Sequence, residues 1–472
     1  MANKIAPQET NVSWHGTRRG AMHTGAPSPM LALLMLALLA PGRSSSGPAP
    51  GWNSREGTTH YAAFSLLHGV YPQKGGSTLQ VVPGPVERGN GGQALFHQGF
   101  DGSTEEPLVD INNGYSNVLY DPDDSFGLGK YRVYYSASVK GAGGGIPGES
   151  GDSATLYATS ADGISWEKPA LHRYELNGST ANNILFQGTT AVGIYDDSFH
   201  DKNASSRFKM WGNLPGDEWG GGPGVESLEA EEPRLGYTAQ LGGSAVSANG
   251  LNWTDYRRIQ NPSDSAKVKD TLRFDAQASL YFDSRTEKYT GTMRAFRPCD
   301  TCGGCPIWWQ PHGGCQADVE RHKDSCNAVQ CNRTVRAIGA SFSSSDDFQT
   351  TEWGPNEVVQ RNPEGPERQF YSQISFPFYN VYLGIVMVFS AMDPPNVYGK
   401  GFVHCELSWS ADGKNYTRIS PNQDFIPRGS IESKGFDSHI CFASAHPVKL
   451  PNETRIYYMG GAPPCSSCLA LL

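Results

Sequence analysis

The sequence lacks any long stretch in which apolar residues recur with a helical period, and this absence argues against a helical fold. It also lacks an apolar run long enough to span a bilayer, because the run at residues 30–40 is far shorter than about 20 residues. Basic residues are scarce: 38 Lys and Arg stand against 47 Asp and Glu, which gives a net charge of -9. This balance excludes nucleic acid and anionic membranes as expected partners, and leaves neutral or cationic ones.

What the sequence has is glycine, proline and aromatic residues. There are 55 Gly and 32 Pro in 472 residues, and aromatics make up 11%. Such a composition, with short alternating apolar runs, indicates β-structure rich in turns. The length would hold two or three average domains, but all-β units often run longer as one.

The first 57 residues are predicted to lie outside the folded domain. Arg18 and Arg19 precede the apolar run, which ends in small residues, so residues 1–41 are interpreted as a signal peptide or leader and 42–57 as a disordered linker. We expect a secreted protein or one in the secretory lumen, with a signal anchor as the alternative. Ten cysteines follow the leader, together with six glycosylation sequons. The sequons are at Asn177, Asn203, Asn252, Asn332, Asn415 and Asn452.

A repeated motif organises the rest of the chain. SADGISW at 160–166 returns as SANGLNW (247–253), SSSDDFQTTEW (343–353) and SADGKNY (410–416). Each copy follows an alternating apolar run, and Asp-Gly or Asn-Gly supplies the positive-φ residues of a tight hairpin turn. The spacing matches one four-stranded sheet plus loops, so a radial repeat is predicted. We expect Asp162 and Trp166 to make an outer turn and a contact between blades.

The predicted fold is an all-β, five-bladed β-propeller over residues 58–472, with four-stranded antiparallel blades. Four complete blades can be assigned between residues 116 and 419, and a fifth begins near residue 439. Its outer strands are expected from the N-terminal segment 58–104. A truncated or misjoined gene model is the alternative.

Aligning the inner strands of the blades gives a second repeat. Asn113, Asp275, Tyr371 and Asp437 fall at one equivalent position. Two residues on lie Tyr115, Gln277, Gln373 and His439. Because inner strands line the axis and residues two apart point the same way, these polar groups are predicted to converge at one mouth of the propeller. Long loops at 140–152, 213–233 and 298–333 belong to the same end, as expected of a ligand site.

Four segments carry a resemblance to a known family. They are FDAQASLYFD (274–283), ERQFYSQISFPFYNVYLG (367–384), HCELSWSADG (404–413) and GFDSHICFASAHPV (435–448). Together they resemble the five-bladed β-propeller glycoside hydrolase superfamily, similar to family 32 and 43 glycosidases, over residues 107–460. The invertase-type Trp-Met-Asn-Asp-Pro-Asn-Gly opening is absent, and the segment starting at Asp110 is its nearest counterpart. The second blade offers no carboxylate at the expected place.

The resemblance implies cleavage of glycosidic bonds in an oligo- or polysaccharide, with one carboxylic acid protonating the leaving oxygen and a second carboxylate attacking carbon or activating water. Asp275 would be the nucleophile, base or transition-state stabiliser and Glu367 the acid, with Asp437 and Asp110 as further candidates. The expected sugar-binding residues are Asn113, Tyr115, Gln277, Arg294, Tyr371, Gln373 and His439, with Trp308 and Trp309 as an apolar platform. No cofactor is expected, although calcium stays open.

Two other functions are considered. A non-catalytic carbohydrate-binding propeller would keep aromatics and amides without a close carboxyl pair. A sialidase-like propeller is less favoured, since its Asp-box would read Ser-x-Asp-x-Gly-x-x-Trp, whereas Asp162 is followed at once by Gly163. An Asp at a strand start is more often a turn or cap residue. Glu406 and His404 are expected to be structural.

The cysteines form the other local signal. Six of them lie in the insertion 298–333, where disulfides that staple the loop are favoured over a zinc site and 15 pairings are open. They are Cys299, Cys302, Cys305, Cys315, Cys326 and Cys331. Cys405 and Cys441 are expected on neighbouring strands, either free or paired.

Overall fold

A computed structural model describes most of the region from residue 88 onward, in thirteen ranges. These are residues 88–96, 109–111, 114–139, 153–187, 191–213, 242–258, 276–298, 334–349, 352–361, 368–390, 402–433, 435–462 and 465–471. The predicted leader, linker and cysteine-rich insertion lie outside them. Within these ranges the chain is almost wholly β-structure, with two short 3-10 helices, η2 (Gly89–Gly92) and η3 (Ala204–Ser206). None of the described helices is long and apolar enough to cross a membrane.

The first sheet is built around one long apolar strand, β3. It has antiparallel neighbours on both sides, with β1 and β2 along one edge and β4 along the other. Its strands are β1 (Val109–Asp110), β2 (Asn117–Tyr120), β3 (Tyr131–Val139), β4 (Ser153–Ser160), β5 (Trp166–Glu167) and β6 (Ile184–Gln187).

The second and third sheets are simple four-stranded meanders. Each follows the chain order from the inner strand outward, as expected of a propeller blade. The second contains β7 (Gly193–Asp196), β8 (Phe208–Asn213), β9 (Gly242–Ser247) and β10 (Trp253–Arg258). The third contains β11 (Ser279–Asp283), β12 (Lys288–Pro298), β13 (Thr334–Phe342) and β14 (Glu357–Gln360).

The fourth sheet has seven strands, and here the prediction of five separate blades is corrected. The described residues form four main sheets because the expected fourth and fifth blades are joined by one parallel backbone pair, Val403 with Ile440. The first part contains β15 (Arg368–Phe378), β16 (Val381–Ser390), β17 (Phe402–Ser410) and β18 (Thr417–Arg418). The second part contains β19 (Ile440–Ala443), β22 (Tyr457–Ala462) and β23 (Cys465–Leu471). A small hairpin, β20 (Val448–Lys449) with β21 (Thr454–Arg455), is separate.

The outermost strand of this last part comes from the end of the sequence. β23 pairs antiparallel with β22, and η2 lies against β23. The segment 58–104 that was expected to complete the last blade falls mostly outside the described residues. The C-terminal segment, for which no strand was predicted, therefore supplies the third strand here.

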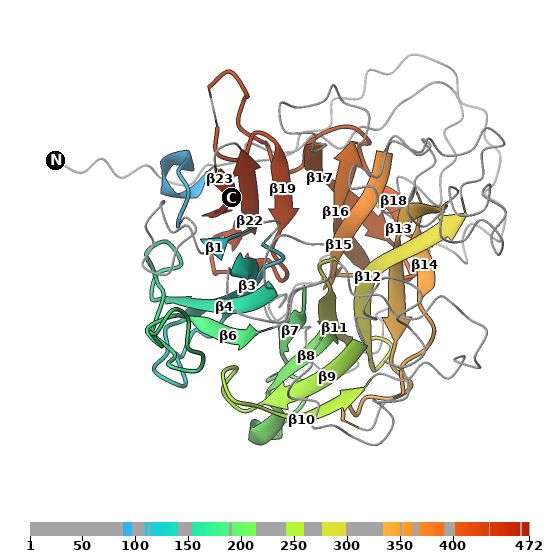
Figure 1. The fold of residues 1–472 in the computed structure, drawn as a ribbon. Helices are drawn as coiled ribbons and strands as arrows, with labels where there is room; N and C mark the ends of the chain where they lie inside the picture. Colours follow the sequence, from blue (N-terminus) through green and yellow to red (C-terminus); the bar gives the residue numbers. More distant parts are fainter. Residues whose placement is uncertain are drawn as a thin grey trace, which may run out of the picture. The chain divides into compact units, whose positions relative to one another are not determined.

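The first and last sheets meet, which makes the arrangement a closed propeller. Asn117 forms a parallel bridge with Ala445, whose amide donates to the Ser116 carbonyl at 2.8 Å. Figure 1 shows the blue-green strands β1 and β3 beside the dark red strands β19 and β22. The all-β propeller predicted from the sequence is confirmed, with four sheets in place of five.

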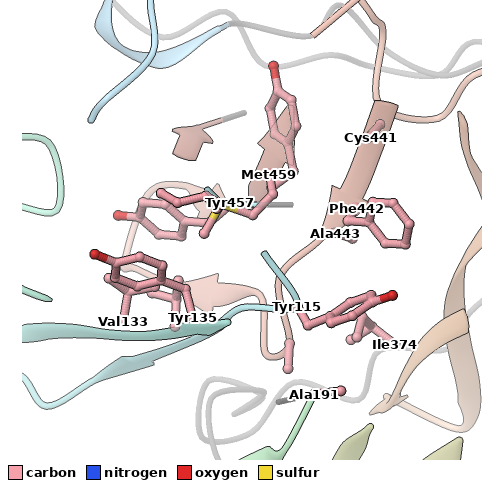
Figure 2. Close-up of a cluster of buried hydrophobic side chains, with 14 of the residues drawn as sticks. Tyr115, Val133, Tyr135, Ala191, Ile374, Cys441, Phe442, Ala443, Tyr457 and Met459 are labelled. Carbon is pink, nitrogen blue, oxygen red and sulfur yellow. The ribbon is translucent and has the colours of Figure 1, made fainter. Parts of the chain in front are cut away.

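The core lies between neighbouring sheets and is largely aromatic. Tyr135 of the first sheet and Tyr457 and Met459 of the last belong to one buried cluster (Figure 2). Full burial of such large side chains supplies about 1.5–3 kcal/mol each, so these faces hold the ring together.

The repeated turn adopts the same geometry in three copies. The Gly163 amide donates to Ser160 Oγ at 2.8 Å, and the next two amides donate to Asp162 Oδ1. The same pattern recurs at Asn249 and Gly250, and again at Asp412 and Gly413. The three glycines have φ of 73° to 77°, a region that favours glycine.

The tryptophans of the repeat pack against the preceding sheet in the ring. Trp166 meets Tyr457 edge-on at a centroid distance of 5.9 Å. Trp253 lies 6.4 Å from Phe186, and Trp353 lies 5.1 Å from Trp211. The expectation that SADGISW forms an outer turn and an inter-blade contact is confirmed.

Candidate functional site

The predicted site residues divide into those that the structure describes and those that it does not. Asp110 lies in β1, where its backbone pairs with Ser138. The described residues also include Tyr115, Gln277, Arg294, Tyr371, Gln373, Asp437 and His439. Asn113, Asp275, Trp308, Trp309, Glu367 and the six cysteines of the insertion lie outside the described residues. Asp275 and Glu367 each immediately precede a described range in the sequence.

Two tyrosines from different sheets meet where the inner strands begin. The hydroxyl of Tyr115, just ahead of β2, donates to that of Tyr371 in β15 at 3.4 Å. Both rings also stand edge-on to Phe442 of β19, at centroid distances of 5.5 Å and 5.1 Å. We call Tyr115, Arg294, Arg336, Tyr371 and Phe442 the Tyr371 cluster. Of the polar residues predicted to converge from several blades, Tyr115 and Tyr371 meet in this cluster.

Arginines of the third sheet give this cluster its electrostatic character. Arg294 in β12 places its guanidinium 4.3 Å from the centre of the Tyr371 ring and donates through Nε to the Tyr371 carbonyl at 3.2 Å. Arg336 in β13 lies 5.4 Å from the same ring. Burial alone would raise the pKa of Tyr371, but the two guanidiniums and the bond from Tyr115 lower it below its usual 10.0. The positive charge beside the ring therefore favours the ionised form of this phenol more than in an ordinary tyrosine.

The backbone ahead of β2 is bent to bring Tyr115 into place. Tyr115 has φ of 37°, which is rare for a large side chain and costs about 1–3 kcal/mol. Gly114 before it has φ of 74°, and a Cβ there would lie 2.3 Å from Met459. Only glycine therefore lets this segment approach β22 so closely. Backbone strain of this kind is concentrated at functional sites, so the strain at Tyr115 supports its place among the candidate site residues.

The two glutamines are held by bonds within the protein. Gln277 is fully buried and donates through Nε2 to the Ser116 carbonyl at 2.9 Å, so it links the third sheet to the first. Gln373 is also buried, and it donates to Ser375 Oγ at 2.8 Å and accepts from Ser408 Oγ at 3.1 Å. Both side chains brace the inner strands near the axis.

Asp437 is fully buried and has a partner for each carboxylate oxygen. Oδ1 accepts from the Gly429 amide at 2.7 Å, and Oδ2 accepts from the Tyr458 hydroxyl at 2.8 Å. Arg88 adds an ion pair to Oδ2 at 3.2 Å. Burial and the neighbouring Asp437 charge raise the pKa of Tyr458, which keeps its proton on the phenol. The carboxylate is thus fixed in orientation by three groups.

His439 lies two residues after Asp437 in the sequence, but its side chain makes different contacts. Its ring stacks on Phe402 with centroids 5.1 Å apart, and Nδ1 lies 2.9 Å from Ser438 Oγ. Burial, together with the nearby Arg428 charge, lowers the pKa of His439 below 6.5. The imidazole is therefore neutral at pH 7 and offers one donor and one acceptor.

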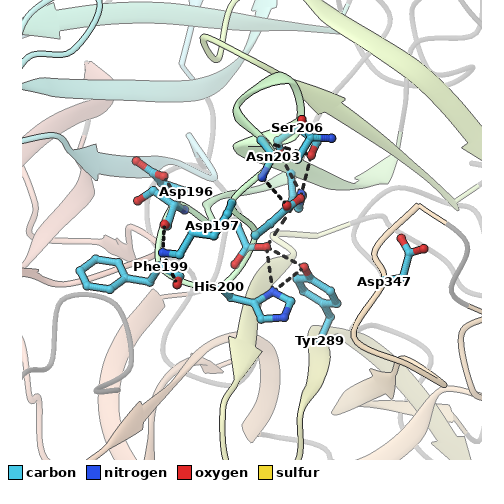
Figure 3. A network of polar contacts seen from close by, with 12 residues as sticks. Asp196, Asp197, Phe199, His200, Asn203, Ser206, Tyr289 and Asp347 are labelled. Atoms are coloured by element: carbon cyan, nitrogen blue, oxygen red, sulfur yellow. Dashed lines mark hydrogen bonds and ion pairs between the residues drawn. The ribbon is translucent and has the colours of Figure 1, made fainter. Parts of the chain in front are cut away.

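A second polar network, which sequence reasoning missed, lies between the second and third sheets (Figure 3). Buried Asp197 accepts from the Tyr289 hydroxyl at 2.6 Å, while His200 Nδ1 lies 3.4 Å from the same carboxylate oxygen. Burial raises the pKa of Asp197 despite these bonds. Asp283 accepts from Tyr382 at the equivalent place one blade on. This recurrence indicates that the network joins neighbouring blades. Its signal in the sequence is an Asp at the end of the inner strand in these two blades, since Asp197 directly follows β7 and Asp283 is the last residue of β11.

The described part of the chain contains no group of three or more His, Cys, Asp or Glu side chains suited to hold a metal ion.

Comparison with known proteins gives structural likenesses alone. No protein-family model matches the chain, and no curated protein matches it by sequence. Among solved structures, a glycoside hydrolase is similar at 13% identity and a TM-score of 0.45, over 80% of this chain and 91% of that protein. An N-acetylgalactosamine deacetylase from F. plautii, in complex with blood group B trisaccharide, is similar at 12% identity and a TM-score of 0.43, over 80% of this chain and 93% of that protein. A glycosyl hydrolase from Bacteroides ovatus is similar at 11% identity and a TM-score of 0.40, over 79% of this chain and 93% of that protein. At this level of similarity, the function has to be argued from the chain's own residues.

Proposed function

We propose that the chain is a secreted, carbohydrate-active β-propeller that cleaves glycosidic bonds with carboxylates gathered where the inner strands begin. The observation that supports this most is the Tyr371 cluster, in which Tyr115, Arg294 and Phe442 bring three sheets to one place. Aromatic faces beside a few fixed polar groups are the usual lining of a small-molecule site. A sugar presents apolar ring faces and hydroxyl groups, which the partly exposed Tyr371 and Arg336 would contact, while Tyr115, Arg294 and Phe442 are buried beside them.

The chemistry is divided among the carboxylates. Asp275 acts as nucleophile, base or stabiliser of the oxocarbenium-like transition state, and Glu367 acts as the acid. Asp437 supplies a fixed negative charge, since its oxygens already accept from Gly429 and Tyr458. Asp110 is the fourth candidate. Arg294, Tyr371 and His439 bind sugar hydroxyls.

A second candidate function is a carbohydrate-binding propeller without catalysis. The burial of Asp437 favours it, because both carboxylate oxygens already have partners within the protein and have little capacity left for substrate. Such a protein would keep the Tyr371 cluster as its binding surface.

A substrate screen with matched variants separates the two functions. Wild type, Asp275→Asn and Glu367→Gln are compared on aryl glycosides and on plant or algal polysaccharides, with Asp346→Asn as the control because Asp346 is exposed in an outer turn. If the protein is a hydrolase, the two site variants should lower the turnover rate by about 10³-fold or more, and the control should leave it unchanged. Sugar binding without turnover in wild type supports the binding propeller. Absence of both turnover and binding overturns both functions.

The role of the Tyr371 cluster has its own test. Tyr371→Phe keeps the ring against Phe442 and removes the hydroxyl, so affinity for a bound oligosaccharide should fall about 10-fold while the thermal midpoint stays close to that of wild type. Tyr195→Phe is a comparison variant, because Tyr195 is a buried tyrosine of the second sheet and lies outside the Tyr371 cluster. Equal affinities for wild type and Tyr371→Phe would contradict the proposed contact.

A further inference from the structure

Two buried cysteines face each other where the two parts of the fourth sheet join. Cys405 lies in β17 and Cys441 in β19, and both are fully buried. Their Sγ atoms are 2.7 Å apart, and Cys405 Sγ is 3.2 Å from the Cys441 carbonyl oxygen. Both are free cysteines in the structure, with no bond between the sulfurs. The two sulfurs nevertheless lie within 1 Å of the separation of about 2.0 Å at which a disulfide bond forms.

We propose that Cys405 and Cys441 form a disulfide that fastens the last three strands to the rest of the propeller. The two strands run parallel at this point, and the backbone pair Val403 with Ile440 lies next to the sulfurs. Among the described strands, that single pair is the only ladder contact between β17 and β19. A covalent bond there would replace the hydrogen-bonded ladder that joins strands elsewhere in the sheet.

The bond forms by exchange with a protein or small-molecule disulfide of the secretory compartment. One cysteine thiolate attacks a sulfur of the oxidant, giving a mixed disulfide and releasing one oxidant thiol. The second thiolate then displaces the other oxidant sulfur. The two cysteines lose two electrons and two protons in total, and the oxidant becomes a dithiol.

Burial determines when this exchange can happen. Desolvation, reinforced by the neighbouring Cys405, raises the pKa of the Cys441 thiol well above 9.0, so the folded protein holds no reactive thiolate there. Neither sulfur is open to a partner once β17 and β19 have packed. The bond must therefore form before this face closes, and in the folded protein it should resist added reductant.

The closed loop contains a residue of the proposed site. The chain between residues 405 and 441 carries Gly429, Tyr416 and Asp437, and Asp437 lies four residues from Cys441. The disulfide would limit how far this segment can separate from β17. The inference rests on the two sulfurs and on the proposed secretion, and it stands whether or not the protein is a glycosidase.

The decisive measurement uses the full-length wild-type protein secreted from a eukaryotic host. It is unfolded in guanidinium chloride with iodoacetamide and no reductant, then digested and mapped by mass spectrometry. We expect one linked peptide joining residues 405 and 441. Alkylation of both residues, or linkage of either one to another cysteine, overturns the proposal.

Two further arms test the burial and the stabilisation. Reductant added to the folded protein should leave the linked peptide intact, whereas reductant with denaturant should release it. The double variant Cys405→Ala/Cys441→Ala should lack this linked peptide and keep all other linked peptides. Its thermal midpoint should be about 4 °C lower than that of wild type, because no closed loop restrains the unfolded chain. A linked peptide that is reduced as fast in the folded protein as in denaturant would contradict the burial argument.

Discussion

The hydroxyl of Tyr457, in the last part of the fourth sheet, donates a 2.9 Å hydrogen bond to the carbonyl of Gly163, in the outer turn of the first sheet. Tyr134 of the first sheet makes the same bond at 3.0 Å to Gly250 of the second sheet. The outer turn of one blade is thus anchored by a tyrosine of the preceding blade. At Tyr457 the contact also joins the two ends of the ring.

Removing these hydroxyls tests the anchor. Tyr457→Phe removes the hydroxyl donor to the buried Gly163 carbonyl and should lower the free energy of unfolding by about 1–3 kcal/mol. Tyr134→Phe should cost about 0.5–1.5 kcal/mol, because the Gly250 carbonyl still accepts from Trp253 Nε1 at 3.2 Å. Urea denaturation measures the loss. Tyr120→Phe is the control, because its ring is only partly buried, and it should change the stability by less than about 1 kcal/mol. Equal stabilities of all three variants would contradict the anchor.

Alanine at the turn glycines separates backbone strain from crowding. A Cβ at Gly163 or Gly250 would lie 2.3 Å or 2.4 Å from the tyrosine hydroxyl, whereas Gly127 has φ of 62° and nothing within 4 Å. Gly127→Ala should therefore cost about 1 kcal/mol from the positive φ alone. Gly163→Ala and Gly250→Ala should cost about 2–4 kcal/mol.

Gly413→Ala should fall between these values, since the nearest atom there is Tyr382 Cζ at 3.1 Å. Chemical denaturation ranks the four variants. A loss at Gly127 as large as that at Gly163 would show that crowding by the tyrosine plays no part.

A buried charge network in β17 should dominate the stability of the fourth sheet. Glu406 is fully buried and accepts from Arg418 at 3.0 Å and from the Asn422 amide at 2.9 Å, with His404 Nε2 at 2.8 Å. Glu406→Gln removes the buried carboxylate charge that faces Arg418 and should cost about 3–5 kcal/mol. Glu357→Gln removes an exposed pair with Lys414 and should cost less than about 1 kcal/mol.

The same network should make the free energy of unfolding depend on pH. Burial would raise the pKa of Glu406, but His404, Arg418 and the Asn422 amide lower it below its usual 4.5. The stabilisation is therefore complete above about pH 4.5 and is lost as the pH falls through the lower folded pKa. The stability difference between wild type and Glu406→Gln should shrink on acidification, which urea titrations at several pH values measure. A difference that stays constant would contradict this assignment.

The turn carboxylate offers a second pH test with a natural control. Amide donors from Ile164 and Ser165 lower the pKa of Asp162 from 3.8 to about 2. Asn249 holds the same place in the second copy and accepts the same two bonds without a charge. Asp162→Asn should therefore keep the turn while losing the part of the acid dependence between about pH 4 and about pH 2. Carboxyl NMR titration of the Asp162 signal in wild type gives the pKa directly.

The strands were predictable because their signal is local. Tyr131–Val139 and Val381–Ser390 are long runs rich in aromatic and β-branched residues, bounded by turn residues, and such a run indicates a strand whatever the rest of the chain does. β6 was missed because it is only four residues long. The joining of two blades into one sheet was also missed. It depends on a single pairing between Val403 and Ile440, which no local sequence pattern predicts.

The candidate site was predictable only where the repeat supplied a register. Aligning the blades selected Tyr115 and Tyr371, and their hydroxyls lie 3.4 Å apart. Arg336 was not found, because it reaches the Tyr371 ring from β13 through the pairing of that strand with β12. Asp275 and Glu367, outside the described residues, stay predictions.

The contact between Asn117 and Ala445 has a consequence for how the chain folds. Residues more than 300 positions apart must meet before the ring is complete, and such distant pairings raise the contact order and slow folding. Each blade can form from its own meander, but the first blade has an uncovered face until β19 and β22 arrive. During synthesis that face would be the part of the nascent chain most open to chaperones and to aggregation.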